Sequence, residues 1–277
     1  MFQKFSNSWG LIKASASVLR ADKELVVFPI ISSLALLIVT ASFFVPLFAF
    51  DAVFKDSTGI LGYILMFLFY VVQYTVIFFF NSALVGAAMI RLDGGDPTVG
   101  DGFRIAFSRF GAIIGYALIA ATVGMILRGV SERSGGFGKF VIGLIGMAWN
   151  LATFLVVPIL VTRNVSPFEA IKESTSVLKK TWGEQIVGNV GIGFVFFIGY
   201  LLLGLLAIPA MILAVGSGQP VVIGSTVGAF VIAFLLMALI NATLSGIYTA
   251  ALYRFATTGE AGGFNSSTLR GAFRPKA

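Results

Sequence analysis

Residues 60–90 read ILGYILMFLFYVVQYTVIFFFNSALVGAAMI, a stretch without one charged side chain. As a helix, this stretch is longer than the roughly 20 residues that cross a hydrocarbon core about 30 Å thick. Five further stretches have the same character, at residues 25–50, 111–127, 140–162, 186–215 and 221–253. The sequence therefore predicts an all-α, polytopic integral membrane protein, a helical bundle with about six transmembrane helices.

The composition of the whole chain supports this prediction. Of its 277 residues, 58% are apolar and 11% are charged, whereas soluble domains have about 45–50% apolar and about 25% charged residues. Backbone amides in hydrocarbon must be hydrogen bonded within the protein, so only helices and closed barrels span membranes. The short alternating segments of a barrel are absent from the sequence, and we expect every span to be a helix.

The distribution of basic residues predicts the orientation. Fifteen of the 19 Lys and Arg fall before the first span, after the second, fourth and sixth spans, or in the C-terminal segment, and four fall on the other side. Positive residues in short loops stay in the cytoplasm. We therefore expect both termini to be cytoplasmic.

An amphipathic stretch precedes the first span. Its apolar stripe, spaced by three and four residues, comprises Phe2, Phe5, Trp9, Ile12, Ala16 and Leu19. Lys13 and Arg20 lie off this stripe, and Lys23 follows it. The pattern is typical of a helix in the membrane interface whose basic side chains contact lipid headgroups. Since the net charge of +7 is spread along membrane-flanking segments, we expect anionic lipid as the partner rather than nucleic acid.

A related stretch precedes the fifth span. Ser166, Pro167 and Glu169 form the pattern of an N-cap, a first helical residue and a capping-box partner. Residues 171–179 match residues 12–20 at six of nine positions with a constant offset of 159. Phe168, Ile171, Thr175, Leu178 and Trp182 form its stripe, and its basic residues are Lys172, Lys179 and Lys180.

A third, weaker stretch precedes the third span, where Thr98 is the expected cap and Phe103, Ala106, Phe107 and Phe110 form the stripe. For this copy, chance similarity is an equally good interpretation. We predict three parallel repeats, each an amphipathic helix plus a helical hairpin. The units lie near residues 1–97, 98–165 and 166–255 of a single membrane domain, and residues 256–277 are expected to form a flexible cytoplasmic tail.

Three motifs carry a resemblance to known proteins. They are SWGLIK at residues 8–13, VLRADKEL at 18–25 followed by Phe28-Pro29, and SPFEAIK at 166–172. With them the chain resembles a family of uncharacterised prokaryotic six-span membrane proteins and, more distantly, the membrane domain of some glycerophosphodiester phosphodiesterases. The resemblance implies a fold and a location in the cytoplasmic (inner) membrane of a prokaryote. It implies no reaction, because these motifs mark the starts of helices rather than a reactive site.

The sequence offers little catalytic chemistry. It has no His and no Cys, which removes imidazole bases, thiolates and zinc-thiolate sites. Asp93, Asp96 and Asp101 are the densest carboxylates and have oxygen ligands for a divalent cation, but the Gly-Gly and Asp-Pro dipeptides beside them already favour a turn. We expect no enzyme activity, no cofactor and no metal site.

The spans contain neutral polar residues rather than charged ones. Gln73, Asn81, Asn150 and Asn241 are the candidates to line a cavity, and the alternative is that they hydrogen bond neighbouring helices. Gly111 with Gly115, and Gly224 with Gly228, each have the spacing that predicts close helix packing within the chain, with dimerisation as the alternative. Pro46, Pro158 and Pro209 are candidate kinks.

Two functional hypotheses follow. The first is a non-enzymatic scaffold or accessory protein that engages anionic lipids, a membrane protein partner or a second copy of itself through its basic interfacial helices. The second is a passive or lipid-type transporter with a polar cavity between its helices. The lack of charged residues inside the spans argues against ion-coupled transport.

Overall fold

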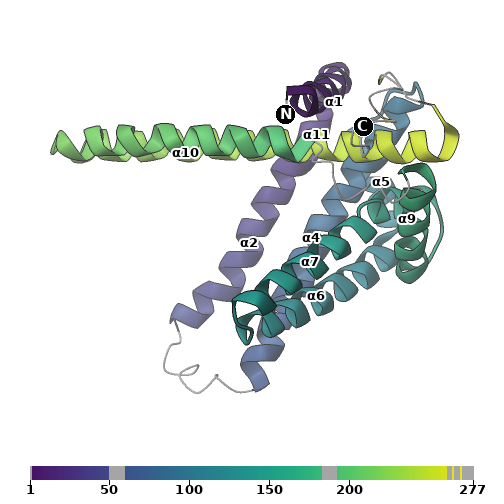
Figure 1. Cartoon of the computed structure of the whole chain (residues 1–277), viewed down its shortest axis with the longest axis horizontal. Coiled ribbons are helices and arrows are strands. Elements are labelled where there is room, and N and C mark those ends of the chain that lie inside the picture. The colour runs from purple at the N-terminus through teal and green to yellow at the C-terminus, as the bar shows by residue number, and fades with distance from the viewer. Residues whose placement is uncertain (1, 50–59, 183–191, 261–263, 265–268, 270–277) are drawn as a thin grey trace.

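The computed structural model describes residues 2–49, 60–182, 192–260, 264 and 269 (Figure 1). Within these residues the chain is helical and has no strand. Six of the described helical segments are long and apolar enough to cross a membrane, which confirms the predicted fold class. Residue 50 and residues 186–191, the ends of two predicted spans, lie outside the described residues.

The helices follow one another in the order of the three predicted units. The first comprises α1 (Phe2–Ala21), the short helix η1 (Lys23–Val26), α2 (Val27–Ala49) and α4 (Ile60–Leu92). The second comprises α5 (Val99–Ser108), α6 (Phe110–Glu132), α7 (Gly136–Ala152) and α8 (Val156–Thr162). The third comprises α9 (Pro167–Trp182), α10 (Ile192–Gly216) and α11 (Pro220–Thr258). Each predicted unit therefore starts with a helix that the sequence predicts to be amphipathic and continues with a hairpin.

The second hairpin helix of the middle unit is broken. Pro158 has no amide hydrogen, and its ring conflicts with the carbonyl of the fourth residue before it, Phe154. The chain leaves the helix at Thr153 and re-enters it at Val156. The amide of Leu155, inside this break, donates a buried hydrogen bond to Ser174 Oγ at 3.0 Å. Pro209, by contrast, lies inside the continuous helix α10.

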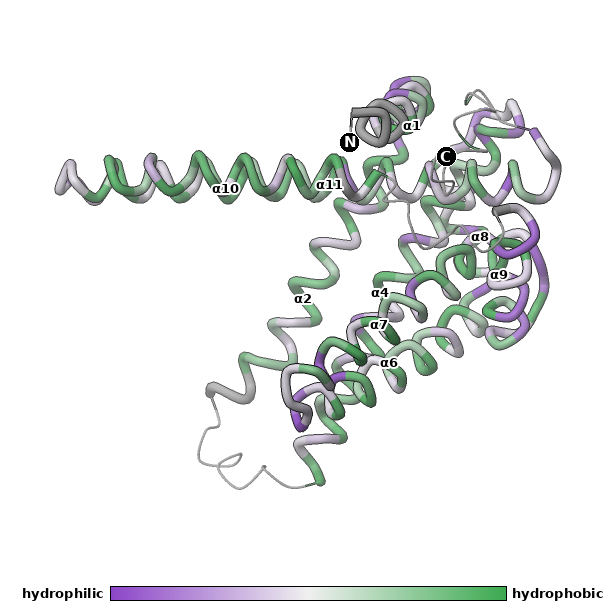
Figure 2. The backbone as a smooth tube through the Cα atoms, viewed as in Figure 1, coloured by the Kyte–Doolittle hydropathy of each residue, from purple (hydrophilic) through white to green (hydrophobic). Residues whose placement is uncertain are grey.

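The core surrounds one end of α4. The buried residues of this helix begin at Phe79 and end at Leu92, and α2, α5, α6, α8 and α11 all pack against it. α5 approaches both α2 and α4 closely, because a Cβ atom on Gly102 would lie 2.4 Å from Phe28 Cζ and 2.7 Å from the carbonyl oxygen of Ala83. Figure 2 shows hydrophilic residues at the helix ends and apolar residues along the spans.

Each amphipathic helix packs on the last hairpin helix of another unit in cyclic order. α5 packs on α4, and α9 packs on α7 and α8. α1, in the first unit, packs on α11 and α10 of the last unit. The contact between α1 and α11 therefore closes the three units into a ring.

The buried faces of α1 and α9 differ from the predicted stripes. The fully buried positions are Leu11 and Ser15 in α1 and Ala170, Ser174 and Leu178 in α9. Phe168, predicted to be on the apolar face, is exposed. The stripes predicted for α1 and α9 are wrong in detail, because the face that packs against other helices is centred on these buried positions instead. The exposed apolar ring of Phe168 still fits a helix in the membrane interface.

The third hairpin projects away from the bundle (Figure 1). We call α10 together with residues 220–241 of α11 the arm. Its two helices pack on each other, but most of its large apolar side chains are exposed, as at Leu213 and Val221. A Cβ atom on Gly224 or Gly228 would meet no atom within 4 Å, so the prediction that these glycines pack within the chain is wrong.

The predicted tail begins too early. Residues 256–258 belong to α11, and Phe264 and Leu269 are buried against the core. A flexible tail from residue 256 is therefore wrong for residues 256–258, which are helical, and for the buried side chains of Phe264 and Leu269. Residues 261–263, 265–268 and 270–277 lie outside the described residues.

Candidate functional site

The basic candidates occupy the outer surfaces of α1, η1 and α9. All six side chains are exposed: Lys13, Arg20, Lys23, Lys172, Lys179 and Lys180. Lys13 Nζ lies 5.9 Å from the centre of the Trp9 ring, within the range of a cation–π contact. Among the described residues, no ion pair involves any of the six.

The two helices present equivalent positions in the same way. At the offset of 159 residues, Ser15 corresponds to Ser174, and both serines are fully buried. Lys13 corresponds to Lys172, and both lysines are exposed. The same holds for the exposed pair Arg20 and Lys179. The sequence similarity between these helices therefore extends to which residues they bury and which cations they expose.

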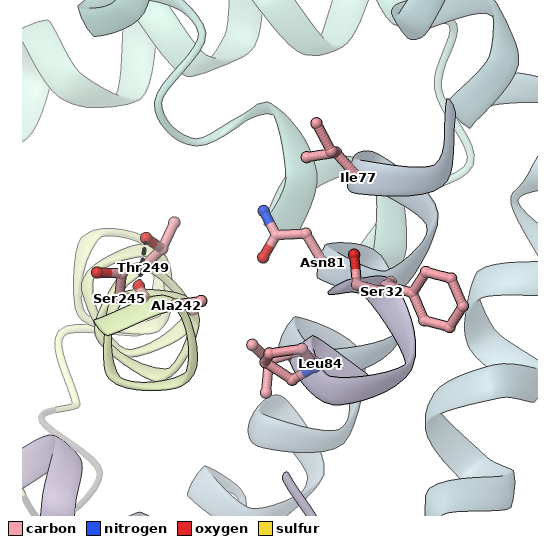
Figure 3. A pocket seen from close by; sticks show the side chains of 10 residues that line it. Ser32, Ile77, Asn81, Leu84, Ala242, Ser245 and Thr249 are labelled. Atoms are coloured by element: carbon pink, nitrogen blue, oxygen red, sulfur yellow. Dashed lines mark hydrogen bonds between the residues drawn. The ribbon is translucent and has the colours of Figure 1, made fainter. Parts of the chain in front are cut away.

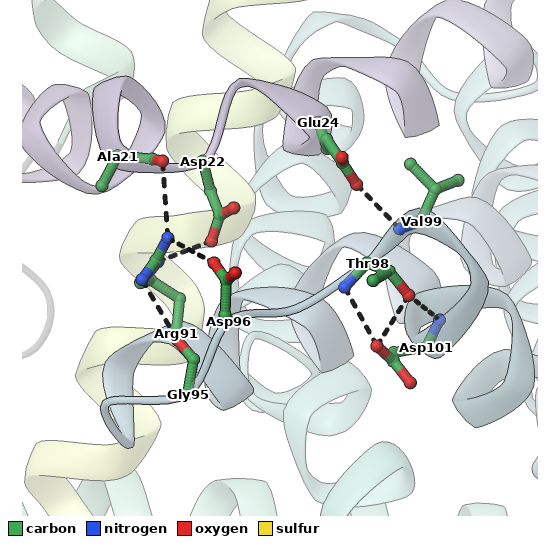
Figure 4. A network of polar contacts seen from close by, with 9 residues as sticks. All are labelled: Ala21, Asp22, Glu24, Arg91, Gly95, Asp96, Thr98, Val99 and Asp101. Atoms are coloured by element: carbon green, nitrogen blue, oxygen red, sulfur yellow. Dashed lines mark hydrogen bonds and ion pairs between the residues drawn. The ribbon is translucent and has the colours of Figure 1, made fainter.

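A polar network fixes the helix ends near α1 (Figure 4). Arg91 Nε at the end of α4 donates to Asp22 Oδ2 at 2.6 Å, and Asp22 is almost fully buried. The same guanidinium donates to the Gly95 carbonyl at 3.1 Å and to Asp96 at 3.0 Å. Glu24 accepts the amide of Val99 at 3.1 Å. Arg91 therefore joins α1, α4 and the loop before α5.

The acidic loop is bonded within the protein. Asp96 pairs with Arg91, and Asp93 pairs with Arg254 of α11 at 2.8 Å. Asp101 pairs with Arg104. No group of three or more metal-ligating side chains occurs in the part of the chain that the structure describes. These carboxylates thus have a structural role in holding three helix ends together.

Two capping boxes begin α5 and α9. The Asp101 amide donates to Thr98 Oγ1 at 3.2 Å, and the Thr98 amide donates to Asp101 Oδ2 at 3.0 Å. Ser166 and Glu169 make the same reciprocal pair at 3.3 and 2.8 Å, which confirms the predicted box. The hydrogen bonds from Thr98 and Ser166 lower the pKa of the Asp101 and Glu169 carboxyl groups, because they stabilise the charged form.

The four neutral candidates do not share one cavity. Gln73 Nε2 donates to Thr40 Oγ1 of α2 at 2.8 Å, which is a helix–helix contact. Asn241 accepts a hydrogen bond from Ser245 at 3.2 Å within α11. Asn81 and Asn150, by contrast, line a common cavity. Gln73 therefore acts as a contact between helices, whereas Asn81 and Asn150 line a cavity. Asn241 bonds within its own helix.

Two cavities meet at Asn81. The α2–α11 cavity has a volume of about 290 Å³ and is lined by residues of α2, α4 and α11, including Asn81 (Figure 3). The α6–α7 cavity has a volume of about 480 Å³ and lies between α4, α6 and α7 with the start of α8. Asn81 is the residue common to both linings.

Several polar cavity residues were not predicted from the sequence. They are Ser32, Ser245 and Thr249 in the α2–α11 cavity and Tyr74, Tyr116 and Thr153 in the α6–α7 cavity. A signal was present in α11, where polar residues recur every fourth position at 241, 245 and 249 and so share one helix face. The Tyr and Thr residues of the other cavity have no comparable spacing.

A family model described as a family of unknown function (DUF6159) matches residues 60–264. The chain belongs to this family. The DUF6159 match begins at α4 and therefore contains Asn81, Asn150 and Asn241, whereas Lys13, Arg20 and the rest of α1 precede it. No curated protein and no solved structure matches the chain. The resemblance to the membrane domain of glycerophosphodiester phosphodiesterases stays a prediction.

Proposed function

We propose that this DUF6159 protein is a non-enzymatic membrane scaffold or accessory protein whose basic helices bind anionic lipids. The observation that supports this proposal is the match between α1 and α9, which bury equivalent serines and expose equivalent cations. Each exposed Lys or Arg near an anionic surface contributes about 1 kcal/mol of binding free energy. The proposal places both termini and these helices at the cytoplasmic face of a prokaryotic inner membrane. A membrane protein partner or a second copy is its further proposed partner.

The packing of α1 and α9 supports this role. The buried faces of the two helices pack against the bundle, so the backbone positions that carry the cations are set. Binding therefore orders the exposed cationic side chains but does not have to order the helices as well.

The test is lipid retention by the purified full chain. The variant Lys13→Gln, Arg20→Gln, Lys172→Gln, Lys179→Gln removes the matched cations, and native mass spectrometry from nanodiscs that contain phosphatidylglycerol counts the retained lipids. We expect at least tenfold weaker retention, which corresponds to about 1.4 kcal/mol. Arg133→Gln with Lys139→Gln, two exposed cations near the α6–α7 turn, is the control. Unchanged retention in the fourfold variant would contradict the proposal.

A second candidate function is passive, lipid-type transport. The observation that favours it is the pair of cavities that meet at Asn81, since transport requires a polar path between apolar helices. The test is lipid exchange between the leaflets of vesicles with and without the protein. Exchange at the rate of protein-free vesicles would exclude this function and leave the scaffold proposal intact.

A further inference from the structure

Neither cavity is lined by a charged residue. The α2–α11 cavity has Pro, Ser, Ile, Phe, Asn, Leu, Ala, Gly and Thr in its lining, and the α6–α7 cavity adds Tyr, Trp and Val. A charged ligand headgroup would have no counterion there, and burying an unpaired charge is costly. The ligand chemistry that fits is therefore uncharged.

The two cavities differ in polarity. Ile77, Phe80 and Leu84 make the α2–α11 cavity mainly apolar, and this cavity is partly open. Tyr74, Tyr116 and Asn150 give the α6–α7 cavity hydroxyl and amide groups, which both donate and accept hydrogen bonds. One apolar and one polar compartment side by side fit an amphiphile, with a chain in the first and a headgroup in the second.

Asn81 stands where these compartments meet. Its side chain points into the space between α4 and α11 (Figure 3), and within the part of the chain that the structure describes it makes no hydrogen bond to protein. It lies ten residues before Arg91 on α4, about 15 Å along the helix. A neutral amide at this depth gains from a partner with a hydroxyl or carbonyl group.

We propose that Asn81 binds the headgroup of a neutral, hydroxyl-bearing lipid such as a diacylglycerol. The headgroup lies beside Asn81, the residue common to both linings, and reaches from there toward the hydroxyl and amide groups of the α6–α7 cavity, and an acyl chain lies in the α2–α11 cavity. The α6–α7 cavity, at about 480 Å³, falls within the range of ligand sites, and the α2–α11 cavity, at about 290 Å³, lies at the lower end of that range. The proposed site deepens the transport candidate by naming its ligand class, but it requires binding only and not movement of lipid between leaflets.

The experiment uses a diacylglycerol that carries a photoreactive diazirine on its acyl chain, with the full chain in phosphatidylcholine nanodiscs. Peptide mass spectrometry locates the labelled residues. We expect labelling of the α2, α4 and α11 residues around the α2–α11 cavity, and competition by unlabelled diacylglycerol. Asn81→Leu should reduce this labelling at least fivefold, because it removes the amide and narrows both cavities.

Gln73→Leu is the matched control, since it removes a neutral amide from the same helix outside both cavities and should leave the labelling unchanged. Asn150→Leu changes an exposed residue of the α6–α7 cavity, so it preserves folding, and it should also reduce labelling. A diazirine phosphatidylcholine that labels the same residues equally well would overturn the proposal, as would unchanged labelling in Asn81→Leu and Asn150→Leu. Specific labelling without lipid exchange would refute the transport function and support the lipid site at Asn81. Lipid exchange without specific labelling would support transport and refute the site.

Discussion

The two halves of α11 have the same chemistry and different surroundings. From Thr243 to Phe255 the helix is largely buried against α4, α1 and α8, and Ile247 is 0% exposed. From residue 220 to 241 it belongs to the arm, where Ile232 is 59% exposed. Both halves are apolar, and together they form one uninterrupted helix. Hydropathy therefore identifies a span but does not say which face contacts protein, because lipid chains are as apolar as Leu.

Glycine shows the same contrast. A Cβ atom on Gly246 would lie 2.4 Å from Leu84 Cδ2, whereas one on Gly228 would meet nothing within 4 Å. At Gly246 the absence of a side chain lets α11 approach α4. At Gly228 no described neighbour requires it. The spacing of Gly224 and Gly228 was thus the weaker guide to packing, and the isolated Gly246 marks the actual contact.

The largest expected effect separates two isoleucines of α11. Ile247→Ala should lower the free energy of unfolding by about 2–5 kcal/mol, because it leaves a cavity in the core. Ile232→Ala should change it by less than about 0.5 kcal/mol, since lipid or detergent fills the space. Unfolding of both variants by SDS titration measures the difference. Equal losses would mean that the arm packs as tightly as the core.

The next largest effect is the loss of stability expected when a larger side chain replaces a glycine of α11. Gly246→Val should cost about 1–3 kcal/mol, because Leu84 is buried and has little room to move. Gly228→Val, the same change in the arm, should leave the thermal unfolding temperature almost unchanged. A marked loss in Gly228→Val would show that another molecule covers this face in the assay.

A smaller effect is expected at the base of α11. Arg254 pairs with Asp93 and with Glu260, but both carboxylates are mostly exposed and water screens the pairs. Arg254→Gln should cost about 1 kcal/mol or less, and raising the ionic strength should reduce this difference. Thermal unfolding at low and high salt checks it. A loss that salt does not change would point to packing of the Arg254 side chain instead of its charge.

The sequence predicted local features well and the arrangement of helices poorly. The six spans and the Ser166 cap follow from hydropathy and from adjacent residues, which act within one or two helical turns. The central position of α4 depends on close approaches such as Gly102 to Phe28, which join distant residues. The cavity at Asn81 was partly predictable, because a neutral amide in a span has few roles. Which of the four amides would meet a cavity depended on helix packing, and the sequence left it open.

The smallest expected effect is faster hydrogen exchange in acid at the starts of α5 and α9, which the arm should not show. Between residues 192 and 241 the chain has no Asp, Glu, Lys or Arg, whereas the capping carboxylates Asp101 and Glu169 have lowered pKa values. A lowered pKa in the folded state contributes stability above the ordinary pKa, and this contribution is lost as the pH falls through the lowered value. Hydrogen exchange, corrected for intrinsic rates, should therefore accelerate at the first turns of α5 and α9 below about pH 4 and stay constant in the arm.

Thr98→Val should remove the effect at α5 alone, because α9 has its own cap. Acceleration in the arm to the same degree would mean that the arm depends on the charged end of the bundle and that the two halves of α11 unfold together.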